Sequence, residues 1–188
     1  MASSTHTHPR PLIDRITQYG ALVLMVLILI AVPLQVLLAL LITPGGLFLI
    51  GSGVTLLLLP FLLMLTVATP PVTVSANGLQ IDPLIWGSQI VTWDDVQAVK
   101  DYPLLPSADA EVGRKLMVGR KKYRVAQGIM LIIPALPRRY RVTGFFTGEG
   151  NTPVIALTNR THTGYEALLR QVFTHLPDEV TNEVEESS

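Results

Sequence analysis

The chain has 188 residues and no cysteine. Without cysteine it can form no disulfide framework, no thiolate zinc site and no cysteine nucleophile. Charged residues are also scarce, at 15% of the chain, and the 14 basic and 14 acidic residues cancel to a net charge of zero. Their distribution is uneven, because the stretch from Ile16 to Ile81 contains no Asp, Glu, Lys or Arg. The rest of the chain is organised around this uncharged stretch.

Two long apolar blocks lie within the uncharged stretch, at residues 20–42 and 47–68, with four residues, 43–46, between them. A helix needs about 20 apolar residues to cross the roughly 30 Å hydrocarbon core of a bilayer, and each block has this length. Because lipid offers no partner for backbone amides, such a block is stable there only as a helix. The short joint makes the two helices antiparallel. The sequence therefore predicts a two-helix transmembrane hairpin over residues 16–69.

Prolines and small residues lie inside the predicted spans. Pro33 and Pro60 each remove one backbone hydrogen bond and favour a kink. The small residues 51–53 (Gly-Ser-Gly) allow a neighbouring helix to approach closely, and we expect packing within the helical hairpin rather than a dimer interface. Neither span contains an ionisable residue, which argues against a proton or ion pathway through the membrane.

The flanks of the spans predict their orientation. Lys and Arg accumulate on the cytoplasmic side of membrane spans. Arg10 and Arg15 precede the first span, whereas the joint between the spans has neither residue type. We therefore expect a multi-pass protein of the plasma membrane with its N-terminus and its C-terminal domain in the cytoplasm. The polar residues 1–15 are expected to be a disordered lead, and the acidic residues 178–188 a disordered tail.

Residues 70–177 have the pattern of a small α+β domain. Asn77-Gly78 is a strong two-residue β-hairpin signal, and short alternating segments flank it. Further strands are expected at 89–93, 96–99, 139–147 and 152–158. A capping box of Thr163 and Glu166 then begins one amphipathic helix, which Pro177 ends. The apolar stripe of this helix consists of Tyr165, Leu168, Leu169, Val172, Phe173 and Leu176.

Three segments carry a resemblance to a known family: Val74 to Ile81, Ile90 to Val96, and Ala156 to Asn159 leading into Tyr165 to Leu169. In its order of parts, the domain resembles the bacterial pleckstrin-homology-like domain. The resemblance implies a strongly bent antiparallel sheet, or barrel, closed by a C-terminal helix. Members of this family often follow a pair of membrane spans, as here. The likeness covers about residues 70–177 and implies a bias toward binding, with no catalytic residue.

Basic residues are concentrated between residues 100 and 141, on both sides of an apolar segment at 128–137. Near an anionic cytoplasmic leaflet each contributes on the order of 1 kcal/mol of attraction. The candidate residues for binding lipid headgroups or a partner are Arg120, Lys121, Lys122, Arg124, Arg138, Arg139 and Arg141. Two interpretations of the apolar segment stay open, a buried strand at 129–133 or an exposed loop that contacts the membrane. The acidic tail either shields the basic segment or only solvates the chain end.

The sequence contains no recognisable catalytic motif: no P-loop, no Gly-x-Ser-x-Gly elbow, no His-Glu-x-x-His and no dinucleotide fingerprint. His162 and His175 lie too far apart for helical metal ligation, and the histidines at 6 and 8 lack a third ligand. We expect Asp94 and Asp95 to cap a turn rather than act as a catalytic pair. Trp86 and Trp93 are expected to be core or interfacial residues rather than platforms for stacking bases.

These observations favour a non-enzymatic protein without cofactor, metal or nucleic acid. Its expected partners are the lipid bilayer and either anionic lipid headgroups or another membrane protein. Two functions remain. The first is a binding or scaffold module at the cytoplasmic membrane face, and the second is a structural or regulatory subunit of a larger membrane complex.

Overall fold

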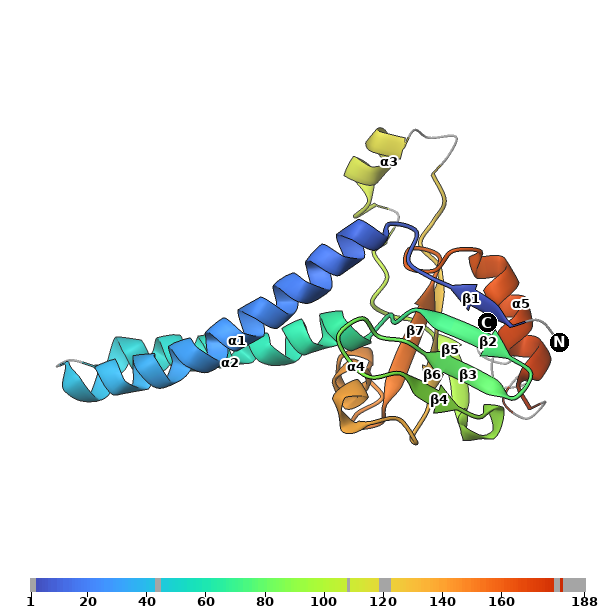
Figure 1. Cartoon of the computed structure of the whole chain (residues 1–188). Helices are drawn as coiled ribbons and strands as arrows, with labels where there is room; N and C mark the ends of the chain where they lie inside the picture. The colour runs from blue at the N-terminus through green and yellow to red at the C-terminus, as the bar shows by residue number, and fades with distance from the viewer. Residues whose placement is uncertain (1–2, 43–44, 108, 119–122, 178–179, 181–188) are drawn as a thin grey trace.

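The computed structural model describes residues 3–42, 45–107, 109–118 and 123–177, together with Val180. Two long helices project from an α+β domain built of two antiparallel sheets (Figure 1). The expected helical hairpin followed by an α+β domain is therefore confirmed at this level of architecture. Of the predicted acidic tail, only Val180 lies within the described residues, and it is buried.

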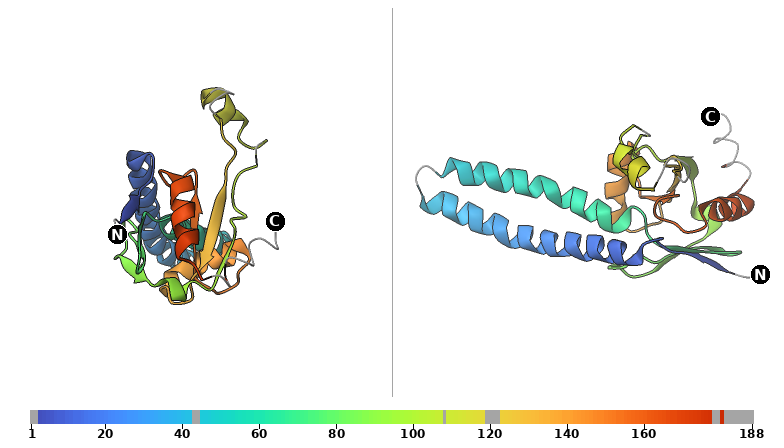
Figure 2. Two further views of the ribbon diagram at one scale, coloured as in Figure 1. Left: turned by 90° about the vertical axis from the view of Figure 1, so that its right-hand side faces the viewer. Right: turned by 90° about the horizontal axis from the view of Figure 1, so that it is seen from above.

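The two long helices are α1 (Pro11–Leu41) and α2 (Gly46–Val67), and they run antiparallel beside each other (Figures 1 and 2). Both are long and apolar enough to cross a membrane. They pack through a small cluster of Ala21, Ile28 and Leu62, while most of their large apolar side chains are exposed. This apolar surface is larger than a water-soluble monomer normally exposes, so we expect lipid or another protein to bury it. Pro33 and Pro60 lie inside the helices without ending them.

The prediction of a disordered lead over residues 1–15 is wrong for the described part of that segment. Ser4–His6 form a strand, β1, which pairs antiparallel with β2 (Val72–Ser75), and α1 already begins at Pro11. A three-residue strand has no periodicity of its own to detect, and its order comes from its partners. The His6 ring is buried and its Nδ1 donates a hydrogen bond to the Thr163 carbonyl over 2.8 Å. The helical hairpin is therefore the connection between two neighbouring strands of one sheet.

The first sheet has the strand order β1-β2-β3-β4, with β3 at Gly78–Ile81 and β4 at Gln89–Val91. The predicted hairpin between β2 and β3 is confirmed, but its two-residue turn is Ala76-Asn77 rather than Asn77-Gly78, because Gly78 already pairs with Ser75 as the first residue of β3. The second sheet has the order β5-β6-β7, formed by Ala98–Asp101, Gly128–Ile132 and Val154–Thr158. All pairs are antiparallel. The apolar segment therefore contributes a buried central strand, β6, so the interpretation as a strand is confirmed.

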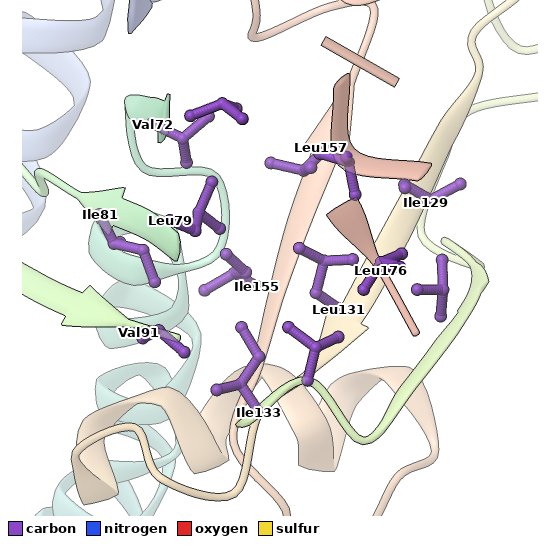
Figure 3. Close-up of a cluster of buried hydrophobic side chains, with 14 of the residues drawn as sticks. Val72, Leu79, Ile81, Val91, Ile129, Leu131, Ile133, Ile155, Leu157 and Leu176 are labelled. Carbon is purple, nitrogen blue, oxygen red and sulfur yellow. The ribbon is translucent and has the colours of Figure 1, made fainter. Parts of the chain in front are cut away.

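The core lies between the two sheets, as Figure 3 shows. Leu79 and Ile81 from the first sheet point toward Leu131 and Ile155 from the second, and all four side chains are completely buried. The predicted C-terminal helix is α5 (Tyr165–His175), and it adds its apolar stripe to the same core. Its cap differs from the prediction. Gly164, in the left-handed conformation at φ +62°, occupies the N-cap. The Thr163 N–H instead donates to the Thr7 carbonyl in the N-terminal segment.

Residues 139–147, which alternate like a strand, are helical instead. They form a 3₁₀ turn, η2 (Arg138–Tyr140), followed by α4 (Arg141–Thr147). The helix ends at Gly148, whose left-handed conformation at φ +88° is unfavourable for other residues. The prediction of a strand here was wrong, and the helix α4 packs against α2 and β7. A second short helix, α3 (Val112–Val118), lies between β5 and β6.

The sequence expectation for Asp95 is confirmed. Thr92 and Asp95 form a capping box at a 3₁₀ turn, η1 (Trp93–Asp95), with the Thr92 hydroxyl donating to Asp95 Oδ2 over 2.7 Å. Trp93 is buried in the core, and its indole N–H donates to the Ser75 carbonyl.

The end of α2 is fixed to the domain by packing and by hydrogen bonds. Val67 is completely buried in the domain core, and the Ala156 N–H donates to the Ala68 carbonyl over 2.7 Å. The Trp86 indole N–H donates to the Thr66 hydroxyl over 3.0 Å. Together with the pairing of β1 on β2, these contacts anchor both ends of the helical hairpin, so the domain is held in a defined orientation relative to α2.

Candidate functional site

A cavity of about 870 Å³ opens beside the start of α1. Four arginines line it, and they come from four different structural segments between residues 10 and 170. These residues, which define the arginine pocket, are Arg10, Arg124, Arg160 and Arg170. One acidic residue, Glu166, also lines the cavity. Guanidinium groups bind phosphate and carboxylate groups through paired N–H donors, so this lining is suited to an anion.

Each arginine is positioned by a different element. Arg10 is the N-cap residue of α1, and Arg124 lies in the segment that leads into β6. Arg160 lies in the turn after β7. Arg170 is on the exposed side of α5, one turn after Glu166, and its Nε donates to the Glu166 carbonyl over 3.3 Å. The pocket therefore exists only in the folded domain with the start of α1 in place.

Arg160 is the most firmly held of the four. Its Nη2 donates to the Arg124 carbonyl over 2.8 Å and forms an ion pair with the Glu111 carboxylate, which is buried. The Tyr123 hydroxyl donates to the same carboxylate over 2.8 Å, and the Arg160 guanidinium lies 5.7 Å from the Tyr123 ring centroid. Asn159 Nδ2 adds a bond of 2.8 Å to the Val125 carbonyl. These contacts fix the position of the Arg160 guanidinium at one wall of the pocket.

The charge of the arginine pocket is only partly neutralised within the chain. Glu111 balances Arg160, and Glu166 lies 3.2 Å from Arg124 in an exposed ion pair of the kind that contributes little stability. Within the described residues, Arg10 and Arg170 form no ion pair. Two cationic groups are therefore free to bind an anion, and a third is held only weakly by its carboxylate.

Two neutral side chains lie at the base of the pocket. His162 is buried, with Nδ1 accepting from the Thr158 N–H over 3.2 Å and Nε2 donating to the Pro70 carbonyl over 2.9 Å. Burial lowers the pKa of His162 to about 4, so the ring is uncharged near pH 7. Burial also raises the pKa of the Tyr165 hydroxyl to about 12, and the nearby charge of Asp101 acts in the same direction. The positive charge of the pocket thus comes from its arginines.

The sequence-predicted binding residues do not all come together. Arg120, Lys121 and Lys122 lie outside the described residues. Arg124 lines the arginine pocket. The other three described candidates, Arg138, Arg139 and Arg141, belong to η2 and α4. They follow β6, whereas Arg124 precedes it, and the five residues of β6 extend over about 16 Å.

Arg139 is held by aromatic side chains near the end of α2. Its guanidinium carbon lies 5.4 Å from the Trp86 ring centroid and 5.3 Å from that of Tyr140, both distances typical of cation–π contacts. Because Trp86 also bonds to Thr66 of α2, this arginine is part of the junction between helix and domain. It has a structural role that sequence reasoning did not assign to it.

Sequence reasoning missed three of the four pocket arginines, namely Arg10, Arg160 and Arg170. The sequence showed that Glu166 and Arg170 share one face of a helix. No feature of the sequence around Arg10 indicated that Arg10 would lie beside that face. Within the described residues, no cluster of three or more His, Asp or Glu side chains is arranged to hold a metal ion. No family model matches the chain, and neither a curated protein nor a solved structure is significantly similar to it.

Proposed function

We propose that α1 and α2 cross the plasma membrane as a helical hairpin and hold the domain at the cytoplasmic face. The lengths of the two helices, their exposed apolar side chains and the arginines that flank the start of α1 support this arrangement. The two helix ends that join the domain lie on the same side of the helical hairpin (Figure 1). With two spans, the N-terminus and the domain therefore share one compartment.

The domain is proposed to have the pleckstrin-homology-like architecture. A four-stranded and a three-stranded antiparallel sheet pack on each other, and the C-terminal helix α5 adds to the core between them. This order of parts agrees with the resemblance in the sequence. The helical hairpin would then be inserted between the first two strands of the domain rather than simply precede it.

The proposed function is that of a non-enzymatic binding module for the phosphate group of an anionic lipid headgroup. One observation carries this proposal: four arginines from four separate segments converge on one cavity beside the start of α1. The pocket lies on the domain side of the helical hairpin, because Arg10 precedes the apolar block that begins at residue 20 by about 15 Å along the helix. The helical hairpin already attaches the domain to the membrane, so headgroup binding in the pocket is not needed to recruit the domain. It can instead select one type of headgroup.

Native mass spectrometry of the full-length protein in detergent tests this function, with phosphatidylglycerol and phosphatidylcholine as the added lipids. The wild type is expected to bind phosphatidylglycerol preferentially. Arg170→Gln removes about 1 kcal/mol of attraction and weakens binding of phosphatidylglycerol about fivefold. Glu166→Gln is expected to strengthen that binding, because Arg124 loses its competing carboxylate.

Lys100→Gln is the matched control, since it removes the same charge from a residue that is paired with Glu149 and does not line the pocket. Equal binding of both lipids by the wild type, or equal effects of Arg170→Gln and Lys100→Gln, would overturn the proposal.

The alternative function, a subunit of a larger membrane complex, is supported by a different surface. β4 is an edge strand of the first sheet, and its Ile90 side chain is 81% exposed. Exposed edge strands are natural sites for a partner protein to add a strand. Purification in a mild detergent distinguishes the two functions, because a protein recovered alone and as a monomer contradicts the subunit function.

A further inference from the structure

The helix α4 carries an exposed aromatic side chain beside α2. Phe145 is 70% exposed, an unusual position for a phenylalanine unless something covers it. Its ring packs edge-on against Phe146, with centroids 5.5 Å apart. Phe146 in turn packs edge-on against Phe61 of α2, with centroids 6.5 Å apart. The three rings form a continuous apolar surface that joins α4 to the side of α2.

The contact with Phe61 places α4 along α2 rather than beyond its end. Phe61 precedes the end of α2 at Val67 by six residues, or about 9 Å at 1.5 Å per residue. The 22 residues of α2 extend over about 33 Å, close to the thickness of a hydrocarbon core. Figures 1 and 2 show α4 beside the domain end of α2. A membrane that extends along α2 as far as Phe61 therefore reaches α4 as well.

Cationic side chains lie at the start of the same segment. Arg138 is exposed in η2, and Arg141 is the first residue of α4. Arg139, next to them, is stacked on Trp86 at the end of α2. Basic residues together with aromatic side chains are typical of protein surfaces that lie in the membrane interface, and here the indole is supplied by Trp86 from another segment.

We propose that α4 inserts into the boundary between headgroups and acyl chains, with Phe145 in the acyl region and Arg138 and Arg141 at the phosphates. This inference depends on the proposed membrane crossing of α1 and α2. The occupant is lipid rather than a protein partner because the ring cluster is continuous with the exposed side of α2, where Phe61 and Leu57 face outward. The segment acts as a second membrane contact that fixes the tilt of the domain.

The absence of cysteine makes a direct depth measurement possible. Single cysteines replace Phe145, Leu57 and Thr174 in the full-length protein, which is spin-labelled and reconstituted in phosphatidylglycerol and phosphatidylcholine vesicles. Leu57 is 73% exposed within α2 and is the reference for lipid. Thr174 is exposed in the last turn of α5 and is the reference for water. Collisions with oxygen and with a water-soluble nickel chelate report the depth of each label.

The label at Phe145→Cys is expected to collide with oxygen more, and with the nickel chelate less, than the label at Thr174→Cys. A label at Phe145→Cys that matches the one at Thr174→Cys overturns the inference, provided that the label at Leu57→Cys lies in lipid. Low collision rates with both reagents also overturn it, because they indicate a protein interface. If the label at Leu57→Cys is in water, the membrane crossing itself is contradicted, so the two failures are distinguishable.

Discussion

Acidification should destabilise the domain through His162. The ring is buried between the Thr158 N–H and the Pro70 carbonyl, and its folded-state pKa is about 4. An unfolded histidine has a pKa of about 6.5. The unfolded state therefore binds more protons between these values, and stability falls as the pH falls through this window.

The size of the effect follows from the two pKa values. Each unit of pKa difference corresponds to about 1.4 kcal/mol, so complete protonation of the unfolded state costs on the order of 3 kcal/mol of stability. Between pH 8 and pH 5 the loss from this one residue is about 2 kcal/mol. The contribution of His162 is fully present above pH 6.5 and is lost as the pH falls toward 4.

Denaturant unfolding of the full-length protein in detergent measures this loss, with tryptophan fluorescence as the signal. The variant His162→Gln keeps a donor for the Pro70 carbonyl but cannot titrate, so its unfolding free energy should depend less on pH by about 2 kcal/mol over the same range. His8→Gln is the matched control, since it replaces a histidine that takes no part in the hydrogen bonds to Thr158 and Pro70. If wild type and His162→Gln show the same pH dependence, the structural role assigned to His162 is wrong.

Two further substitutions test the packing around the pocket and in the core. Arg160→Gln removes the ion pair between the Arg160 guanidinium and the buried Glu111 carboxylate, and we expect a loss of up to about 3 kcal/mol in unfolding free energy, of which Glu111→Gln in the same chain restores part. An additive double variant would contradict the coupling. Leu131→Ala leaves a cavity at a completely buried position on the central strand β6 and should lower the free energy of unfolding by about 3 kcal/mol. The control Val125→Ala, at an exposed position, should change the denaturation midpoint little.

The parts of the fold with a strong local signal were predictable from the sequence. The long uncharged stretch predicted α1 and α2 because each of its apolar blocks has the length of a membrane-spanning helix. Asn77-Gly78 predicted the β2–β3 hairpin but not its register, because Gly78 begins β3, where a Cβ would clash with the Val91 carbonyl oxygen. The stripe from Tyr165 to Leu176 predicted α5 because its apolar residues recur at helical spacing.

Elements whose structure comes from distant contacts were not predictable. β1 has three residues, and it is ordered by β2 and by the buried ring of His6. Residues 141–147 alternate like a strand, yet the surface of α2 and the left-handed Gly148 make them a helix. Short apolar segments are ambiguous in this way because helix and strand bury similar side chains.

The arginine pocket shows the same limit at the level of the site. Its members span residues 10 to 170, and the start of α1 is brought to the turn after β7 by the pairing of β1 with β2 and by the hydrogen bonds of His6 and Thr7 to Thr163. Basic residues are concentrated between residues 100 and 141 of the sequence, and this concentration predicted a single basic patch. The fold instead separates Arg124 from the arginines of η2 and α4, so that one group lines a pocket and the other lies at the junction with α2.

Thiol labelling in intact cells tests the central claim most directly, because the chain has no cysteine of its own. Gly46→Cys places a thiol at the start of α2, at the turn of the helical hairpin, and Thr174→Cys places one on the domain. A membrane-impermeant maleimide should label Gly46→Cys from outside the cell and label Thr174→Cys only after permeabilisation. Labelling of Thr174→Cys in intact cells, or release of the protein from membranes by carbonate, would contradict the account.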